Sequence, residues 1–316
     1  MLVRSYGSQV AVRTPAKLNL FLEVLGRRVD GYHELETLMV AVALFDSLHF
    51  SPREDGEIRL SCRWSLGHEA AVVRAQREGR HAAWDLLPPE RTNLVWRAIE
   101  KLRQRAGVES GADVQLVKNI PSAAGLGGAS SDAAAALLGA NQLWNLGWSV
   151  EQLADLAAEL GSDVPFFVER RAGEAAASVC RGRGEQVEPL DCVPNLHCVL
   201  VRPPAGLSTA LVFRGCRPAE QPRSVEPLVR ALRSGDLAAI GRTLHNRLQE
   251  PATELSPWIE KLQATFRRLD VVGHQMSGSG TTYFGICHHA THARRTVQRL
   301  RQAGWQAVFY AVAPAA

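Results

Sequence analysis

The stretch Gly125-Leu126-Gly127-Gly128-Ala129-Ser130-Ser131-Asp132-Ala133-Ala134-Ala135 decides how the rest of this sequence is interpreted. Its glycines are typical of a tight loop, and its alanines have high intrinsic helix propensity. The pattern therefore predicts a glycine loop that runs directly into the start of a helix. The first backbone N–H groups of a helix lack intrahelical partners, and the helix dipole adds positive character at that end. We expect this junction to bind an anion, most often a phosphate.

Other glycine-loop motifs fit this stretch less well. A P-loop would close with Gly-Lys-Ser/Thr, which the stretch does not contain. Gly125 and Gly127 half match the dinucleotide-binding fingerprint, but Ser130 replaces the third glycine and no clear acidic strand end follows. A turn without a ligand needs only one or two glycines, whereas three glycines and two serines leave N–H groups exposed. We therefore favour a phosphate site over a turn without a ligand.

The composition indicates a soluble protein of ordinary type. The chain has 316 residues and a net charge of +4. Its 36 lysines and arginines are interspersed with 32 acidic residues and form no basic stripe, so we expect no nucleic-acid partner. The N-terminus lacks the apolar core of a signal peptide, and no run of about 18 apolar residues could span a membrane. We therefore expect a cytoplasmic protein with no membrane partner. The six cysteines form no CxxC pair, and we interpret His288, His289 and His292 as a polar helix start, so no metal site is predicted.

Alternation, caps and turn signals divide the chain into interspersed strands and helices. Strands are predicted over residues 10–25, 35–50, 112–118, 281–287 and 305–312. A helix capped by Thr92 is predicted over residues 92–106, and another helix directly after the glycine loop. Further helices are predicted over residues 149–160, 236–249, 256–269 and 290–303. Residues 203–227 are predicted to be a loop or connector. The pattern favours two α+β domains, residues 1–175 with a surface insertion at about 63–91, and residues 176–316.

A lysine and an amide lie two residues apart in Pro15-Ala16-Lys17-Leu18-Asn19-Leu20-Phe21. On a strand, Lys17 and Asn19 share one face, while the leucines share the other. The common interpretation of such a lysine is a solvated strand face. However, lysine occurs at only four positions in this arginine-rich chain, so its retention beside an asparagine suggests a function.

Asp163 lies in Gly161-Ser162-Asp163-Val164-Pro165-Phe166-Phe167, after a capped helix. An isolated aspartate in a turn usually bonds its own backbone. Here apolar residues follow at once, and they would partly desolvate the carboxylate, which makes it a candidate general base if a cation keeps it ionised. The turn Asp30-Gly31-Tyr32-His33 is either an exposed hairpin tip or a stacking platform for a flat ligand, and the residues alone do not decide between them.

Together these motifs resemble those of the GHMP kinase superfamily. Its three signatures are present as Pro15-Ala16-Lys17-Leu18-Asn19, Pro121 to Ser131, and Met276-Ser277-Gly278-Ser279-Gly280-Thr281. Within it, the chain looks most like the kinases of 4-diphosphocytidyl-2-C-methyl-D-erythritol. That narrower resemblance depends on Asp30-Gly31-Tyr32-His33-Glu34-Leu35, on Gly161-Ser162-Asp163-Val164-Pro165-Phe166, and on the Ser-Gly-Ser-Gly form of the last loop.

The resemblance implies a ribosomal-protein-S5-like N-terminal domain, which binds ATP, and a ferredoxin-like C-terminal domain. It implies that Lys17 and Asp163 are the catalytic pair, with ATP as co-substrate and Mg²⁺ as cofactor. Asn93 and Lys118 are expected near the adenine. The residues expected around the ATP phosphates are Pro121, Ser122, Ala123, Ala124, Gly125, Leu126, Gly127, Gly128, Ala129, Ser130 and Ser131. Those expected at the cytidine end of the substrate are Asn19, Tyr32 and His33, with Thr209 and Phe213 closing over the cytosine.

The implied reaction is ATP-dependent phosphorylation of the substrate's C2 hydroxyl, in the methylerythritol phosphate route to isoprenoid precursors, by a monomer or weak homodimer. Two alternatives stay open: another small-molecule kinase of the superfamily (homoserine or mevalonate type), and a non-catalytic nucleotide-binding regulator. The Tyr32-His33 pair favours a nucleobase on the acceptor, and the presence of both Lys17 and Asp163 favours catalysis. Ala129 stands where the family usually has glycine, and its methyl group fits the loop if its φ is negative.

Overall fold

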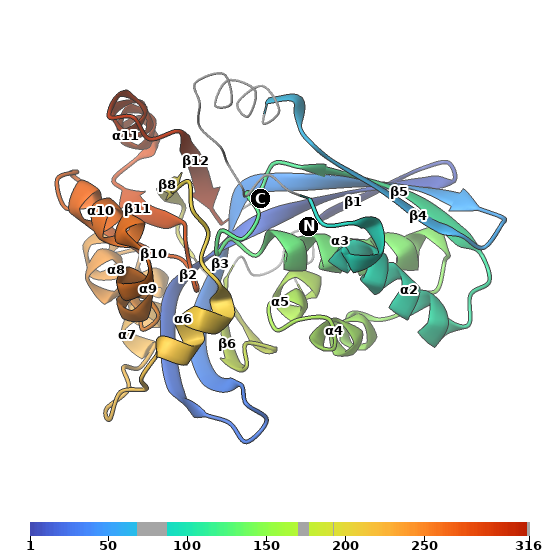
Figure 1. Cartoon of the computed structure of the whole chain (residues 1–316), viewed down its shortest axis with the longest axis horizontal. Helices are drawn as coiled ribbons and strands as arrows, with labels where there is room; N and C mark the ends of the chain where they lie inside the picture. Colours follow the sequence, from blue (N-terminus) through green and yellow to red (C-terminus); the bar gives the residue numbers. More distant parts are fainter. Residues whose placement is uncertain (68–86, 170–176, 192, 315–316) are drawn as a thin grey trace. The chain divides into compact units, whose positions relative to one another are not determined.

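The computed structural model describes residues 1–67, 87–169, 177–191 and 193–314, and it divides the chain into two compact units (Figure 1). The first unit consists of Met1–Ala16, Leu44–Ser122 and Gly127–Glu174. The second consists of Lys17–Ala43, Ala123–Leu126 and Ala175–Ala316. The interspersed strands and helices agree with the predicted α+β class. The predicted domain boundary between residues 175 and 176 lies outside the described residues.

The first unit is a sheet with helices on one face (Figure 1). Its strands come from β1 (Leu2–Tyr6), the start of β2 (Gln9–Arg27), the end of β3 (His33–Arg53), β4 (Ile58–Trp64) and β5 (Gly111–Lys118), in the order β1-β2-β3-β5-β4. Strands β4 and β5 are parallel, and β3 pairs antiparallel with β5. The helices are α2 (Leu94–Ala106), α3 (Gly128–Leu143), α4 (Val150–Ala158) and α5 (Val164–Val168), preceded by the 3₁₀ turn η2 (Glu90–Thr92).

Helix α3 lies in the core of this unit because small residues let it approach the sheet. Ala133 to Ala136 are all fully buried. A Cβ atom at Gly139 would lie 2.4 Å from the ring of Phe50, so only glycine permits this contact with β3. The tight packing fixes the N-terminal end of α3, which follows the glycine loop.

The second unit contains a four-stranded sheet in the order β10-β11-β8-β12, all of whose pairings are antiparallel. Its strands are β8 (Leu196–Arg202), β10 (Gly273–Met276), β11 (Tyr283–Cys287) and β12 (Ala307–Ala313). In chain order this is a 2-3-1-4 arrangement, the ferredoxin-like topology that the resemblance implied. The unit also holds the end of β2, the start of β3, β6 (Ala177–Gly182), β7 (Gln186–Leu190) and β9 (His245–Asn246).

The described part of the second unit also contains six helices. They are α6 (Thr209–Gly215), α7 (Glu226–Ser234), α8 (Leu237–Thr243), α9 (Gln249–Leu255), α10 (Pro257–Phe266) and α11 (Ala290–Gln302). The core between α10 and the sheet includes the rings of Phe266 and Tyr283, whose centroids are 5.1 Å apart.

Several predicted boundaries are wrong. Helix α2 is capped by the side chain of Asn93, which accepts a hydrogen bond from Val95 N, and not by Thr92. The predicted loop at 203–227 contains helix α6 and the start of α7. The predicted helix at 236–249 is helix α8 followed by strand β9, and helix α9 begins only at Gln249. Of the predicted insertion at 63–91, Arg63 and Trp64 complete β4, while residues 68–86 lie outside the described part.

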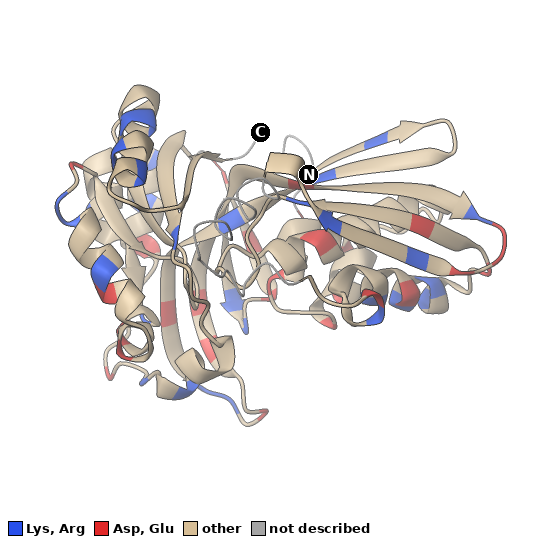
Figure 2. Cartoon of the chain, turned by 45° about the horizontal axis from the view of Figure 1, so that its top comes forward, with Lys and Arg blue, Asp and Glu red and all other residues tan. Residues whose placement is uncertain are grey.

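Charged residues of both signs are interspersed along the ribbons of both units (Figure 2). Arg53, for example, pairs with Asp55, and Arg59 pairs with Glu57. Among the described residues, no helix combines the length and the apolar character needed to cross a bilayer.

Candidate active site

The glycine loop joins β5 to α3 and has the backbone shape that its glycines predict. Gly125 and Gly127 have φ values of 72° and 69°, in the left-handed region that glycine tolerates best. Gly127 is the N-cap of α3, so the N–H groups of the first turn of a 16-residue helix are directed out of its end. Ala129 lies inside the helix, where its methyl group is tolerated, whereas Ala123 takes a positive φ of 48°. The loop therefore has the geometry of an anion site.

Lys17 and Asn19 share one face of β2, as predicted, and that face is buried. Lys17 Nζ donates to Asn19 Oδ1 at 2.6 Å, and the two residues are only 4% and 2% exposed. Asn19 Nδ2 in turn donates to Thr37 Oγ1 at 2.8 Å on β3, which fixes the orientation of the amide. The solvated-face interpretation of Lys17 is therefore wrong. A buried ammonium held by an amide is a preorganised cation.

Three segments that are distant in the sequence meet around Lys17 in the second unit. Lys17 N donates to Leu126 O in the glycine loop at 2.9 Å. Ser277 Oγ accepts from Asn19 N at 3.2 Å and donates to Gly125 O at 2.9 Å. A Cβ atom at Gly278, where φ is 55°, would lie 3.3 Å from Lys17 Nζ. The late loop Ser277–Gly280 thus packs closely beside the lysine ammonium.

The predicted substrate residues also lie in the second unit. The rings of His33 and Phe213 stack with centroids 5.3 Å apart, and Thr209 Oγ1 lies 2.9 Å from Ser279 Oγ in the late loop. Burial lowers the pKa of His33, and nearby Arg27 lowers it further, which favours the neutral imidazole. Tyr32 is 54% exposed, and its ring faces the guanidinium of Arg183 at 5.0 Å. An exposed ring at the end of a hairpin is available to stack on a planar ligand.

Asn93, Lys118 and Asp163 belong to the first unit. Lys118 Nζ is buried between two carboxylates: it donates to Asp132 Oδ2 at 2.5 Å and also to Asp46 Oδ2. Burial lowers the pKa of Lys118, but the two carboxylates outweigh it and raise the pKa above its usual value. The ammonium is therefore permanently charged.

Asp163 directly precedes α5 and is half-buried beside Val164 and Phe166, both fully buried. Its side chain does not cap α5. A carboxylate at the border between water and apolar side chains fits the predicted general base.

Comparison with known proteins identifies the family of this chain. The family model for the GHMP kinases N terminal domain matches residues 93–171, and that for the GHMP kinases C terminal domain matches residues 228–306. A 4-diphosphocytidyl-2-C-methyl-D-erythritol kinase from Pelotomaculum thermopropionicum is 42% identical over 91% of this chain and 92% of its own length. The chain belongs to the GHMP kinases. A kinase of the same name from Shouchella clausii is 38% identical over 92% of this chain and 90% of its own length.

Solved structures place this GHMP kinase in the same family. The crystal structure of a 4-(cytidine 5′-diphospho)-2C-methyl-D-erythritol kinase is 33% identical, with a TM-score of 0.74, covering 97% of this chain and 100% of that one. A homoserine kinase from Cytophaga hutchinsonii has a TM-score of 0.71 at 19% identity, covering 99% and 96% of the two chains, which is a likeness of fold alone. This chain is a small-molecule kinase with the two-domain GHMP fold, and ATP is its co-substrate.

Two polar residues of this kinase site were missed by the sequence analysis. Thr37 orients Asn19 and also donates to Phe21 O at 2.6 Å, and Asn246 holds the late loop through Met276 O and Gly278 O, both at 2.8 Å. A signal for Thr37 was present, because it is a polar residue within an apolar strand. Asn246 lay inside a predicted helix, which hid it.

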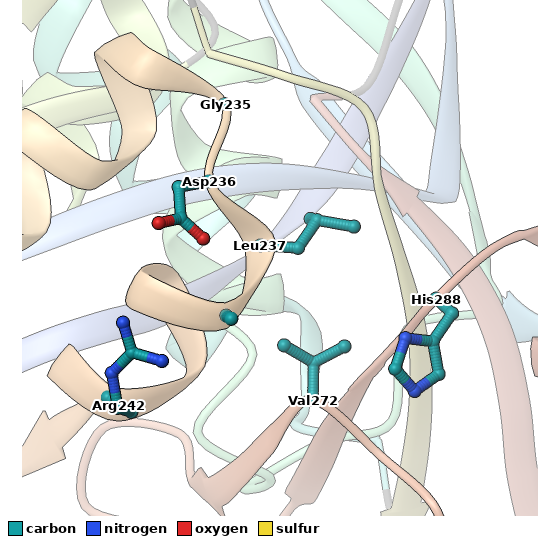
Figure 3. Close-up of a pocket in the computed structure, with 7 residues that line it drawn as sticks. Gly235, Asp236, Leu237, Arg242, Val272 and His288 are labelled. Atoms are coloured by element: carbon teal, nitrogen blue, oxygen red, sulfur yellow. The ribbon is translucent and has the colours of Figure 1, made fainter.

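Neither a metal-binding cluster nor the cavity described below is assigned to the reaction of this kinase. The described residues hold no group of three or more His, Cys, Asp or Glu side chains suited to a metal ion. A cavity of about 650 Å³ is lined by residues of the α7–α8 turn and of α8, together with Val272 and His288 (Figure 3). Because none of the predicted catalytic, ATP or substrate residues lines it, we do not assign the reaction to this cavity.

Proposed function

We propose that this kinase transfers the γ-phosphoryl group of ATP to the C2 hydroxyl of 4-diphosphocytidyl-2-C-methyl-D-erythritol. The observation that carries the proposal is the buried Lys17 ammonium, held by Asn19 where the two glycine loops meet. The relatives at 35–42% identity over more than 90% of the chain are kinases named for that acceptor.

In the proposed mechanism, the ATP phosphates bind along Pro121–Ser131 and the N-terminus of α3, with Asn93 and Lys118 toward the adenine. Asp163 accepts the proton of the C2 hydroxyl while Lys17 orients that hydroxyl and keeps Asp163 ionised. The hydroxyl oxygen forms a bond to the γ-phosphorus, the bond from that phosphorus to the β,γ-bridging oxygen breaks, and ADP leaves. Phosphoryl transfer depends mainly on such positioning and on charge stabilisation.

Mg²⁺ is compatible with the residues present. This ion keeps several waters and binds mainly through substrate phosphates with one or two protein oxygens, so it does not need a dedicated cluster of ligands. The half-buried hydroxyl of Ser130, in the first turn of α3, is the oxygen we propose to hold it. When bound, Mg²⁺ supplies positive charge to the transferring phosphoryl group.

A coupled ADP-release assay tests the acceptor. With ATP and Mg²⁺, we expect ADP release that depends on 4-diphosphocytidyl-2-C-methyl-D-erythritol and is at least about a hundredfold slower with homoserine or mevalonate. Preference for either of those alcohols would assign the chain to another branch of the superfamily. Binding of ATP without phosphorylation of any acceptor would favour a nucleotide-binding regulator.

Tyr32→Ala is expected to raise KM for the cytidylyl acceptor about tenfold or more and to leave KM for ATP nearly unchanged. The reason is loss of ring stacking on the cytosine, which is worth about 1–3 kcal/mol per base. Steady-state kinetics with each substrate varied in turn measures both constants. Tyr32→Phe is the matched control, because it keeps the ring and should keep KM. An equal rise in both KM values would show that the ring has a structural role.

A further inference from the structure

Asn246 occupies a short break between two helices that brings it beside strand β2. Helix α8 ends at Thr243, and Leu244 leaves the helical conformation, with φ −56° and ψ 135°. His245 and Asn246 then pair in parallel with Phe21 and Leu22 as β9. This brings Asn246 close to the strand that carries Lys17 and Asn19.

Both the nitrogen and the oxygen of the Asn246 side-chain amide form hydrogen bonds. Its Nδ2 donates to Met276 O and to Gly278 O, both at 2.8 Å, and its Oδ1 accepts from Leu248 N at 2.9 Å. The residue is only 9% exposed. The two carbonyl groups flank Ser277, so one amide holds both sides of the first residue of the late loop. An asparagine offers two N–H donors and an acceptor at this length, which a carboxylate does not.

The segment held by Asn246 is the one that shapes the surroundings of Lys17. Ser277 Oγ bonds to Asn19 N and Gly125 O, and a Cβ atom at Gly278 would lie 3.3 Å from Lys17 Nζ. A shift of the loop by about 1 Å would therefore change the space beside the ammonium. Misplacement on that scale is able to slow catalysis about a hundredfold.

Strand β9 is itself braced against β2 by the buried carboxylate of Glu23. Arg247 Nε donates to Glu23 Oε1 at 2.7 Å, and His245 Nε2 lies 3.0 Å from Oε2. Burial raises the pKa of Glu23, but the hydrogen bonds from Arg247 and from the backbone of Arg223 and Val24 outweigh it and lower the pKa to about 2. The carboxylate stays ionised, so the residues on both sides of Asn246 are fixed to the strand that carries Lys17.

We propose that Asn246 is a positioning residue for phosphoryl transfer: it holds the Ser277–Gly280 loop against Lys17 and Asn19. The proposal rests on the proposed kinase function and adds a residue to it. Asn246 acts through the loop and not on the substrate, so its loss should affect turnover more than binding.

The decisive variant is Asn246→Asp, which keeps the size and the acceptor for Leu248 N but replaces two donors with a carboxylate facing two carbonyl oxygens. We expect kcat to fall about 10- to 100-fold, with both KM values changed less than about threefold. Independently of any substrate, hydrogen exchange should become faster at two amides of the loop: that of Ser277, which donates to Thr282 O, and that of Gly280, which donates to Ser277 O. Asn246→Ala removes the two N–H donors without adding a charge. It replaces Asn246→Asp in both measurements if the aspartate variant does not fold.

The matched control is Asn141→Asp in the first unit. Asn141 also bridges backbone groups, with Nδ2 to Trp148 O and Oδ1 from Trp148 N, both at 3.1 Å, so its change should lower stability without changing kcat. Unchanged loop exchange in the Asn246 variants, or faster exchange with an unchanged kcat, would overturn the proposal. If the wild-type protein phosphorylates no acceptor, the proposed function fails. Unchanged hydrogen exchange at the loop amides of the Asn246 variants would refute the role of Asn246 without any substrate.

Discussion

Asp163→Asn is expected to lower kcat for acceptor phosphorylation by at least about a hundredfold while KM for ATP stays nearly unchanged. Asparagine has the shape of aspartate but cannot take a proton from the C2 hydroxyl, and general-base assistance is worth about 10²–10⁴-fold. Because the side chain does not cap α5, its replacement should leave that helix intact. Steady-state kinetics by ADP release, together with direct titration of ATP binding, measures the two effects separately.

Asp155→Asn is the matched control for this variant. Asp155 is exposed on α4 in the same unit, so removing its charge should change neither kcat nor stability by a measurable amount. An Asp163→Asn enzyme with full turnover would remove the general base from the mechanism. A loss of turnover accompanied by loss of ATP binding would instead indicate a role in nucleotide binding.

Features that depend on short-range rules were predictable from the sequence. Ser149 and Gln152 form both hydrogen bonds of the predicted capping box, and Gly107 ends α2 in the left-handed conformation. The side chains of Lys17 and Asn19 lie on one face of β2, because alternation along a strand follows from its geometry. The glycine loop and the start of α3 also lie where the composition indicated.

Features that depend on partners distant in the sequence were not predictable. Ile240, Leu244 and Leu248 continue a helical stripe at four-residue spacing, so a single helix over 236–249 was the natural prediction. The chain breaks at Leu244 because pairing of His245 and Asn246 with β2, and the bonds of Asn246 to the late loop, outweigh local helix propensity. Nothing near Asn246 in the sequence identifies these partners.

The ion pairs of Lys118 were likewise not predictable from the sequence. The sequence marked it as one of few lysines, but its partner Asp46 lies 72 positions away. Asp46 also accepts from Ile120 N at 2.9 Å and from Asn119 N, so one carboxylate holds both the lysine and the backbone that leads into the glycine loop. A Cβ atom at Gly128 would lie 3.3 Å from Lys118 Nζ. The ion cluster of Lys118, Asp46 and Asp132 therefore supports both ends of the loop.

Lys118→Met is expected to lower the free energy of unfolding by about 3–5 kcal/mol, because it leaves two buried carboxylates without their cation. Burial, and then the nearby charge of Asp46, raise the pKa of Asp132 even with the lysine present, although Lys118 opposes this rise. Without Lys118, this carboxyl group should therefore bind a proton more readily. Denaturant unfolding at pH 7, with the slope compared between variants, measures the loss.

A double variant distinguishes a buried charge from lost packing at this cluster. Adding Asp132→Asn to Lys118→Met removes one of the two unpaired carboxylates, so the combined loss should be smaller than the sum of the two single losses. Lys101→Met is the matched control, because Lys101 pairs with Glu159 at a partly exposed site where such bridges contribute about 0–1 kcal/mol. A Lys118→Met protein as stable as the Lys101→Met protein would show that the cluster does not hold the loop in place.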